Sequence, residues 1–454
     1  MTDTLATNAD PLRRVAKTER IVALDVLRGF AILAILMMNI PYMGSYISEG
    51  ASDIRNTSWT ANDIFAWRAI GTIFDGTQRG LLELLFGAGI MIMTRAAMKP
   101  DGPVSVADLH FRRNIWLIIF GAFQACVLMW PGDILLPYGV VALFAFPART
   151  LAPKWKAILG VVFMLLAISP AVGRYVERTE MRDAAVAVAA KTAAHKPVAK
   201  AEQAKADKWK EKVESLKPAA QNKKKAEAIA EENKTRMGGI AGYAKFLRDF
   251  WIEFNFSPGG IIGLAEILGT MMLGMALYDW GVLQGRRSAM FYLALAVVGY
   301  GVGAPLRWFA QVDILTFQPF PKIGWMTWDV ARAALTLGHV GAFNLALKSA
   351  WGSRVLSVFQ APGRMPLTVY LSASILTMLI IFPGFGFGQF GKHGWGGLEA
   401  IALAVMAGQL VFANVWMMAF ESGPIDWVWK SLAYKQAQPF RKATGPRAVL
   451  QPAE

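Results

Sequence analysis

The sequence predicts an all-α, polytopic helical membrane protein with about ten transmembrane helices. Of its 454 residues, 55% are hydrophobic and only 17% are charged, which is below the roughly 25% of soluble domains. Several apolar runs are long enough to cross a bilayer, because about 20 helical residues span the hydrocarbon. The sequence lacks the short alternating segments of a transmembrane barrel.

The expected helices form two membrane halves of five crossings each, 21–176 and 239–422. They cover residues 21–44, 79–94, 114–130, 133–148, 157–174, 258–279, 288–306, 325–347, 365–386 and 396–420. Residues 61–76 are amphipathic, and we expect them to lie in the membrane interface or to re-enter the bilayer.

Lysine and arginine residues near the helix ends predict the orientation of the chain. Residues 1–20 form a basic tail without the apolar core of a signal peptide, so we expect an uncleaved first helix. The excess of Lys and Arg in alternate short loops indicates that both termini are cytoplasmic. Residues 423–454 mix Trp and Tyr with Lys and Arg, which is typical of an interfacial tail that contacts membrane lipids. Membrane orientation explains the net charge of +15 more simply than nucleic-acid binding does.

Residues 177–238 differ from the rest of the chain because they are rich in Ala, Lys and Glu. These residues favour helix, but the segment has almost no apolar stripe to bury. We therefore expect a solvated helix or a partly disordered loop on the outer side of the membrane. An ordinary solvated insertion is the simplest interpretation, and a docking site for a protein partner is the alternative.

The first helix carries a polar stripe. Asp25 and Arg28 are three residues apart and hence neighbours on one face, and Asn39 lies within about 20° of the same face. Ionisable groups inside a membrane span are costly, so they persist where they pair or line a polar cavity. The pair either locks helix packing, or Arg28 meets an anionic group such as a phosphate.

Two further segments carry polar side chains between apolar runs. Asp75, Arg79 and Glu83 are spaced four residues apart, so they stack on one helical face as a polar ladder or as part of a binding site. Asp133 follows the turn made by Pro131 and Gly132, where an N-cap for the next helix is favoured over a substrate-binding role.

The eighth expected helix combines acid, base and cation on one face. Asp329 and Arg332 are three residues apart, and Arg332 and His339 are seven apart. A single histidine in a helix is more often a hydrogen-bonded core residue. Its pKa near neutrality nevertheless makes His339, with Asp329, a candidate for acid–base catalysis.

Common cofactor and metal motifs are absent from the sequence. It contains no HExxH or paired-Cys arrangement, so no metal site is expected. It also contains no GxxxxGK[ST] motif, so ATP-driven transport is unsupported. The remaining histidines are expected in a cytoplasmic loop (His110), in the insertion (His195) and in an outer loop (His393).

Six motifs in order resemble the YeiB-like family of bacterial inner-membrane proteins, the domain-of-unknown-function 418 family. They are LDVLRGFAILAILMMNI at the start, LFGAG at 85–89, WPGDIL at 130–135, LGTMMLGMALYDWG at 268–281, PGRMPLTVYLSAS at 362–374 and GPIDWVWKSLAY at 423–434. This resemblance implies a multi-pass protein of the bacterial inner (plasma) membrane. The sequence departs from the family pattern at Gln124, where a histidine is usual, and at Val369, where an asparagine is usual.

The first helix is also similar to that of the transmembrane acyltransferase superfamily, whose enzymes pass an acyl group from cytosolic acyl-CoA to an acceptor. The similarity implies that Asp25, Arg28 and Gly29 anchor the donor, with Asn39 near the outer end. Those enzymes use a histidine in or just after the first helix, and here no histidine precedes His110.

Taken together, the sequence favours an acyltransferase-like protein with a polar cavity lined by the first, second and eighth helices. Acyl-CoA would be the donor substrate, no resident cofactor is expected, and the acceptor would be a cell-envelope glycan or lipid. The alternative is a transporter or lipid-handling protein whose polar residues line a permeation path. The residues expected to bind substrate or donor are Asp25, Arg28, Gly29, Asn39, Asp75, Arg79, Asp133 and Arg332, and those expected to catalyse are His339 and Asp329.

Overall fold

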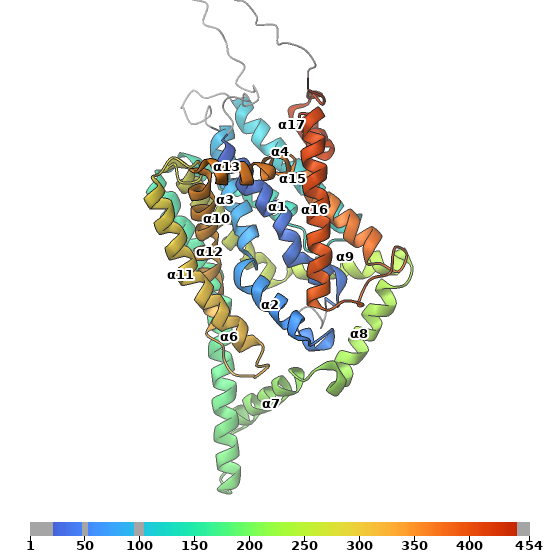
Figure 1. Cartoon of the computed structure of the whole chain (residues 1–454). Helices are drawn as coiled ribbons and strands as arrows, with labels where there is room; N and C mark the ends of the chain where they lie inside the picture. Colours follow the sequence, from blue (N-terminus) through green and yellow to red (C-terminus); the bar gives the residue numbers. More distant parts are fainter. Residues whose placement is uncertain (1–20, 48–52, 95–103, 443–454) are drawn as a thin grey trace, which may run out of the picture.

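The structure is a computed structural model that describes residues 21–47, 53–94 and 104–442. Within these ranges the chain folds into helices, with one isolated β-bridge between Phe420 and Arg441. The expected all-α, polytopic membrane fold is confirmed (Figure 1). The expected tail 1–20 and residues 443–454 of the expected final tail 423–454 lie outside the described residues.

Six described helices are long and apolar enough to cross a membrane. They are α1 (Val22–Gly44), α6 (Pro153–Ala193), α10 (Pro258–Asp279), α11 (Ala289–Ile314), α12 (Gly324–Leu347) and α16 (Trp395–Ala419).

A broken helix pair bent by 76° brings the number of candidate spans among the described residues to seven. Its first arm contains α13 (Ala350–Leu356) and α14 (Gln360–Arg364), and its second contains α15 (Pro366–Ser374) and the π-helical segment Ile375–Ile381. The break falls at Met365 because proline disfavours helical geometry in the residue before it.

The expected count of ten crossings is not confirmed, although the other three expected segments are helical. α3 (Thr77–Thr94) carries Arg79 and Glu83 close to its start. α4 (Val104–Cys126) begins before the expected residue 114 and includes a polar first half. α5 (Leu135–Ala145) has only 11 residues.

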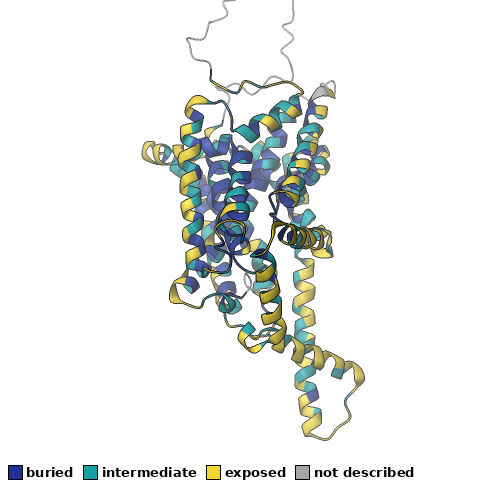
Figure 2. Cartoon of the chain, turned by 90° about the vertical axis from the view of Figure 1, so that its right-hand side faces the viewer, coloured by how far each residue is buried: buried dark blue, intermediate teal, exposed yellow. Residues whose placement is uncertain are grey.

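Burial separates the central helices from the peripheral ones. In its most apolar window, α1 is 72% buried, whereas α6 is 11% buried and α11 and α16 are each 22% buried. The core joins α1, α3 and α10. Figure 2 shows buried residues along the central helices and exposed residues along the outer ones. The exposed apolar side chains of the peripheral helices are suited to contact lipid. Helix α2 (Ala61–Ile73), capped by Thr60 and Asp63, packs against α11 and α16.

The charged insertion is helical throughout most of its length. α6 continues without a break past residue 177, and α7 (Lys200–Ser215), α8 (Lys223–Arg236) and α9 (Ile240–Phe256) lead back to the bundle. Figure 1 shows α7 and α8 on the side opposite α17 (Pro424–Tyr434) and opposite the two ends of the described chain. The high helix propensity of Ala, Lys and Glu explains why the helix extends beyond its apolar part.

One end of the insertion closes the C-terminus of α1. The buried guanidinium of Arg236 donates to the backbone oxygens of Ser45 at 3.1 Å and Tyr42 at 3.3 Å, and also to that of Met43. Glu232 lies 3.2 Å from the same guanidinium and accepts from the backbone N–H of Ile47 at 2.8 Å. The last carbonyls of a helix lack intrahelical donors, so Arg236 supplies both the missing donors and a positive charge at the negative end of α1.

We expect Arg236→Ala to destabilise the protein by about 3–5 kcal/mol, because it leaves the Glu232 carboxylate and the last carbonyls of α1 buried without their cation. The midpoint of thermal unfolding in detergent measures this effect. Lys234→Ala, on an exposed position of the same helix, is the control and should leave the midpoint unchanged. Equal midpoints for the two variants would contradict the capping role.

Candidate functional site

A cavity of about 370 Å³ lies among α1, α3, α4, α5, α15 and α17. Its lining includes Ile21, the first described residue, and Lys430 of α17. The cavity therefore lies toward the side of the bundle on which the described chain begins and ends (Figure 1). We call it the terminal-side cavity.

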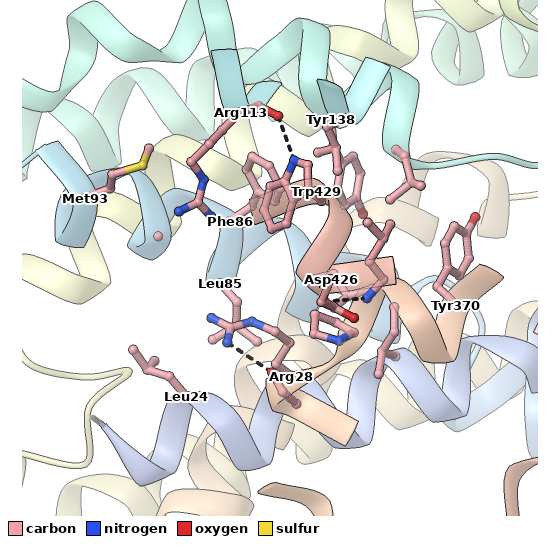
Figure 3. Close-up of a pocket in the computed structure, with 18 of the residues that line it drawn as sticks. Leu24, Arg28, Leu85, Phe86, Met93, Arg113, Tyr138, Tyr370, Asp426 and Trp429 are labelled. Carbon is pink, nitrogen blue, oxygen red and sulfur yellow. Dashed lines mark hydrogen bonds between the residues drawn. The ribbon is translucent and has the colours of Figure 1, made fainter. Parts of the chain in front are cut away.

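Positive side chains from different elements reach this cavity. Figure 3 shows Arg28 of α1 and Arg113 of α4 directed toward the same space. Arg364 and Lys430 also line it, so four cations face two carboxylates, those of Asp25 and Asp426. Charge of this kind favours an anionic ligand group.

Arg28 is held in place by its own helix and by the bent segment. Its Nη1 lies 3.2 Å from Asp25 Oδ1 and 3.3 Å from the carbonyl oxygen of Gly363. The three-residue spacing that the sequence displayed thus produces an ion pair at the cavity wall. The Arg28 side chain is still 28% exposed, so donors of its guanidinium are accessible to a ligand.

Arg113 and Asp426 are fixed by aromatic and backbone contacts. The Arg113 guanidinium lies 4.6 Å from the centre of the Trp429 ring, and the Trp429 indole donates to the Arg113 backbone oxygen at 3.0 Å. Asp426 accepts from the backbone N–H and the hydroxyl of Thr368 at 2.9 and 2.7 Å and from the N–H of Leu367 at 3.2 Å. Asp426 therefore caps the start of α15 and is already satisfied by the protein.

Part of the cavity lining is apolar and includes a tyrosine. Leu82, Leu85 and Phe86 of α3, Leu117 of α4 and Tyr138 of α5 all line the cavity. The Tyr138 hydroxyl lies 3.1 Å from the backbone oxygen of Arg79 and 3.3 Å from a carboxylate oxygen of Glu83. Tyr138 thus stands between the cavity and a group of buried charges.

This group, which we call the charge network, consists of Arg79, Glu83, Glu266 and Arg332. Arg332 pairs with Glu266 and lies 3.4 Å from Glu83, and Arg79 lies 2.8 Å from Glu266 and 3.4 Å from Glu83. The side chains of Glu83, Glu266 and Arg332 are each at most 5% exposed, whereas that of Arg79 is 36% exposed. Two cations and two carboxylates compensate one another, which offsets the cost of burying them.

The network joins three helices because its ion pairs run between them. Arg79 and Glu83 come from α3, Glu266 comes from α10, and Arg332 comes from α12. Asp329 lies 3.4 Å from Arg332 on the same helix, with the spacing that the sequence indicated.

Gly76 allows Arg332 to approach. Its φ is +75°, and a Cβ there would lie 2.7 Å from Cδ of Arg332. Asp75 beside it pairs with the buried Arg307 at 3.1 Å, and the Arg307 guanidinium lies 3.7 Å from the centre of the Trp328 ring. A residue with a side chain at position 76 would therefore be strained in its backbone and would collide with Arg332.

His339 lies in the core, away from the terminal-side cavity. It is 3% exposed, and its two ring nitrogens lie 2.6 Å from the Tyr300 hydroxyl and 3.2 Å from the Thr77 hydroxyl. Neither His339 nor Asp329 lines the cavity. The expectation that the first, second and eighth helices line one cavity is corrected. Helices α1 and α3 line it, whereas Arg332 of α12 pairs with Glu83 of α3 and Glu266 of α10.

Three other residues that the sequence singled out, Gly29, Asp133 and Asn39, are not among those that line the terminal-side cavity. Gly29 packs against the backbone of Phe359 and Gly363, where any side chain would collide. Asp133 accepts from the backbone N–H groups of Leu135 at 3.0 Å and Leu136 at 2.8 Å, which is a helix-capping arrangement. Asn39 is partly buried on α1 and does not line the terminal-side cavity.

Several cavity residues were missed by sequence reasoning. His110 lines the cavity because α4 starts at Val104 and brings it into the helix, whereas the sequence placed it in a loop. Its Nε2 lies 3.1 Å from the Ala142 carbonyl oxygen, so the ring is a hydrogen-bonded part of the wall. In the sequence, Arg113 was only one of the Lys and Arg residues that predict orientation, and Trp429 was only one of the aromatic residues of the expected interfacial tail. The contact between them is tertiary, so helical spacing does not reveal it.

Comparison with known proteins shows similarity to a family of unknown function and to uncharacterized bacterial proteins. Residues 277–436 match the family model described as protein of unknown function (DUF418). The chain is 27% identical over 443 residues to the uncharacterized protein YxaH of Bacillus subtilis, covering 95% of this chain and 99% of YxaH. It is 24% identical to the uncharacterized protein YeiB of Escherichia coli, covering 93% of this chain and 98% of YeiB. No solved structure matches the chain.

We expect Arg332→Met to destabilise the protein by about 3–5 kcal/mol, because it leaves Glu266 and Glu83 buried with one cation too few. Combining it with Glu266→Gln should restore part of the loss, because the variant then buries one carboxylate fewer. The midpoint of thermal unfolding in detergent is the measurement. Losses that simply add in the double variant would show that the two residues are not coupled.

Proposed function

We infer that this chain, which belongs to the YeiB-like family of domain-of-unknown-function 418 membrane proteins, binds an amphiphile with an anionic head and an apolar tail in the terminal-side cavity. The observation that supports this function best is that cationic and apolar side chains line the same cavity. Arg28 and Arg113 provide positive charge, and Leu82, Leu85 and Phe86 provide apolar surface. A ligand that fills this cavity must therefore present both an anionic group and an apolar surface.

We propose the CoA thioester of an acyl chain as this amphiphile. Arginine presents a planar fork of donors that suits phosphate oxygens, and Asp25 holds the fork of Arg28 in position. The acyl chain would enter the apolar part, while the nucleotide would stay at the side of the bundle where the termini lie. On this proposal that side is the cytoplasmic one, since acyl-CoA is a cytosolic metabolite.

The proposed reaction is acyl transfer to a cell-envelope glycan or lipid. The cavity supports the donor half of this reaction. The acid–base role proposed for His339 gains no support from the geometry, because both ring nitrogens already face hydroxyl groups of Tyr300 and Thr77.

A transporter or lipid-handling protein is the second candidate. The charge network favours it, because ionisable residues inside a membrane bundle mark ion and substrate paths in many transporters. Tyr138 would then separate the cavity from Glu83 in one state and admit a substrate in another. This function predicts movement of a solute or lipid across vesicles without consumption of a thioester.

We expect a long-chain acyl-CoA to bind the purified protein with micromolar affinity in calorimetry. Arg28→Ala should weaken this binding by about tenfold or more, equivalent to about 1.4 kcal/mol, because a charge-assisted contact to phosphate is lost. Lys154→Gln changes an exposed cation outside the cavity lining and serves as the matched control.

The thermal midpoints of both variants establish that they are folded. The absence of binding in the folded wild-type protein would remove the donor proposal and favour the transporter. Equal weakening by Lys154→Gln would show that binding follows the net charge rather than the cavity.

A further inference from the structure

A second, larger space lies on the opposite side of the bundle. It measures about 1200 Å³ and is enclosed by the extension of α6, by α7 and the start of α8, and by the segment that joins α11 to α12. We call it the arm basin. Small-ligand pockets are typically about 300–1,000 Å³, so the arm basin is large enough for several linked monomer units rather than one.

The arm basin is strongly positive. Its lining carries seven Lys and Arg side chains and three carboxylates. Some of the cations are paired within the protein: Lys225 lies 3.8 Å from Asp53, Lys223 lies 3.7 Å from Glu227, and the buried Lys322 lies 2.8 Å from Asp313. The carboxylates of the lining are too few to balance the rest, so the space attracts anions.

Aromatic rings lie among these cations. The guanidinium groups of Arg174 and Arg178 lie 5.9 and 5.3 Å from the centre of the Trp325 ring. Phe317 lies in the segment between α11 and α12, and the Arg55 guanidinium lies 3.4 Å from the centre of its ring. Two aromatic rings of the lining thus each lie against arginine guanidinium groups.

Phe317 is held in an unusual backbone conformation. Its φ is +50°, in the left-handed region that a bulky side chain rarely adopts. Such conformations persist only where the surrounding structure enforces them, and they concentrate at binding sites. Here this conformation places an aromatic ring in the lining of the arm basin, next to Arg55.

We propose that the arm basin binds an anionic oligosaccharide, one that carries carboxylate or phosphate groups. Arginine and lysine recognise such groups by charge-assisted hydrogen bonds, while the CH-rich face of a sugar ring packs on an aromatic ring such as Trp325. The proposal follows from the combination of charge, aromatic rings and volume. It concerns a different space from the terminal-side cavity and does not depend on acyl-CoA binding there.

Binding of tetragalacturonate, a carboxylated tetrasaccharide, to the full-length protein tests the proposal, with neutral maltotetraose as the uncharged probe. We expect the anionic sugar to bind at least about tenfold more tightly than the neutral one, and added salt to weaken its binding. Equal affinities, or no binding of tetragalacturonate, would overturn the proposal.

Variants locate the site. The double variant Lys223→Gln with Lys224→Gln, and separately Trp325→Ala, should each weaken binding by about tenfold. Lys208→Gln with Lys210→Gln removes two exposed charges of α7 that do not line the arm basin, and it should leave binding unchanged. Equal weakening by both double variants would show that the whole insertion attracts anions unspecifically and would overturn the proposal.

Two competitors distinguish the sources of the anionic group. Inorganic phosphate at the same concentration should fail to displace the tetrasaccharide, whereas full displacement would reduce the site to an ion site. In nanodiscs of phosphatidylcholine, adding phosphatidylglycerol should leave saccharide binding unchanged. Its loss would show that the arm basin takes lipid headgroups instead.

Discussion

The pairing of Arg332 with Glu266 and Glu83 is the interaction on which the centre of the bundle depends. Helices α3, α10 and α12 each bring charge into a region from which water is largely excluded, and the Glu266 carboxylate of α10 pairs with Arg79 of α3 and Arg332 of α12. Removing one partner would leave a buried, uncompensated charge, which is among the most destabilising changes a protein can suffer. The network therefore fixes which faces of the three helices meet. Gly76 provides the space that this meeting requires.

Tyr138 connects this interior to the terminal-side cavity. Its ring lines the cavity, while its hydroxyl lies within hydrogen-bonding distance of Glu83 and of the Arg79 backbone. Tyr138 therefore belongs both to the cavity lining and to the surroundings of the charge network. The opposite side of the bundle is organised separately, by Arg236 at the end of α1 and by the basic arm of the insertion.

Local patterns in the sequence were sufficient for the helices and for contacts within one helix. The all-α membrane fold, the Asp25–Arg28 pair and the proximity of Asp329 to Arg332 all follow from helical spacing. Contacts between helices could not be derived in this way, because spacing reveals which residues share a face but not what that face meets. For this reason the sequence did not reveal that Arg332 pairs with α3 and α10 rather than lining a cavity with α1. It also did not reveal that His339 lies between Tyr300 and Thr77.

Helix ends were a second limit. Because α4 starts at Val104, it carries His110 and Arg113 into the cavity wall, and the apolar run from 114 gave no sign of that extension. The insertion shows a related limit: its composition predicted helix, but only the fold reveals that Arg236 is buried against the last turn of α1. The alternative role of the insertion, as a docking site for a protein partner, stays a prediction.

Photoaffinity labelling with an acyl-CoA whose acyl chain carries a terminal diazirine, followed by peptide mapping, would locate the acyl chain in the protein. A donor site in the terminal-side cavity predicts label on the α3 segment that contains Leu82, Leu85 and Phe86, and an excess of unlabelled acyl-CoA should remove it. Label confined to lipid-facing positions of α6 or α11, or label on α12 around His339, would contradict a donor site in the terminal-side cavity.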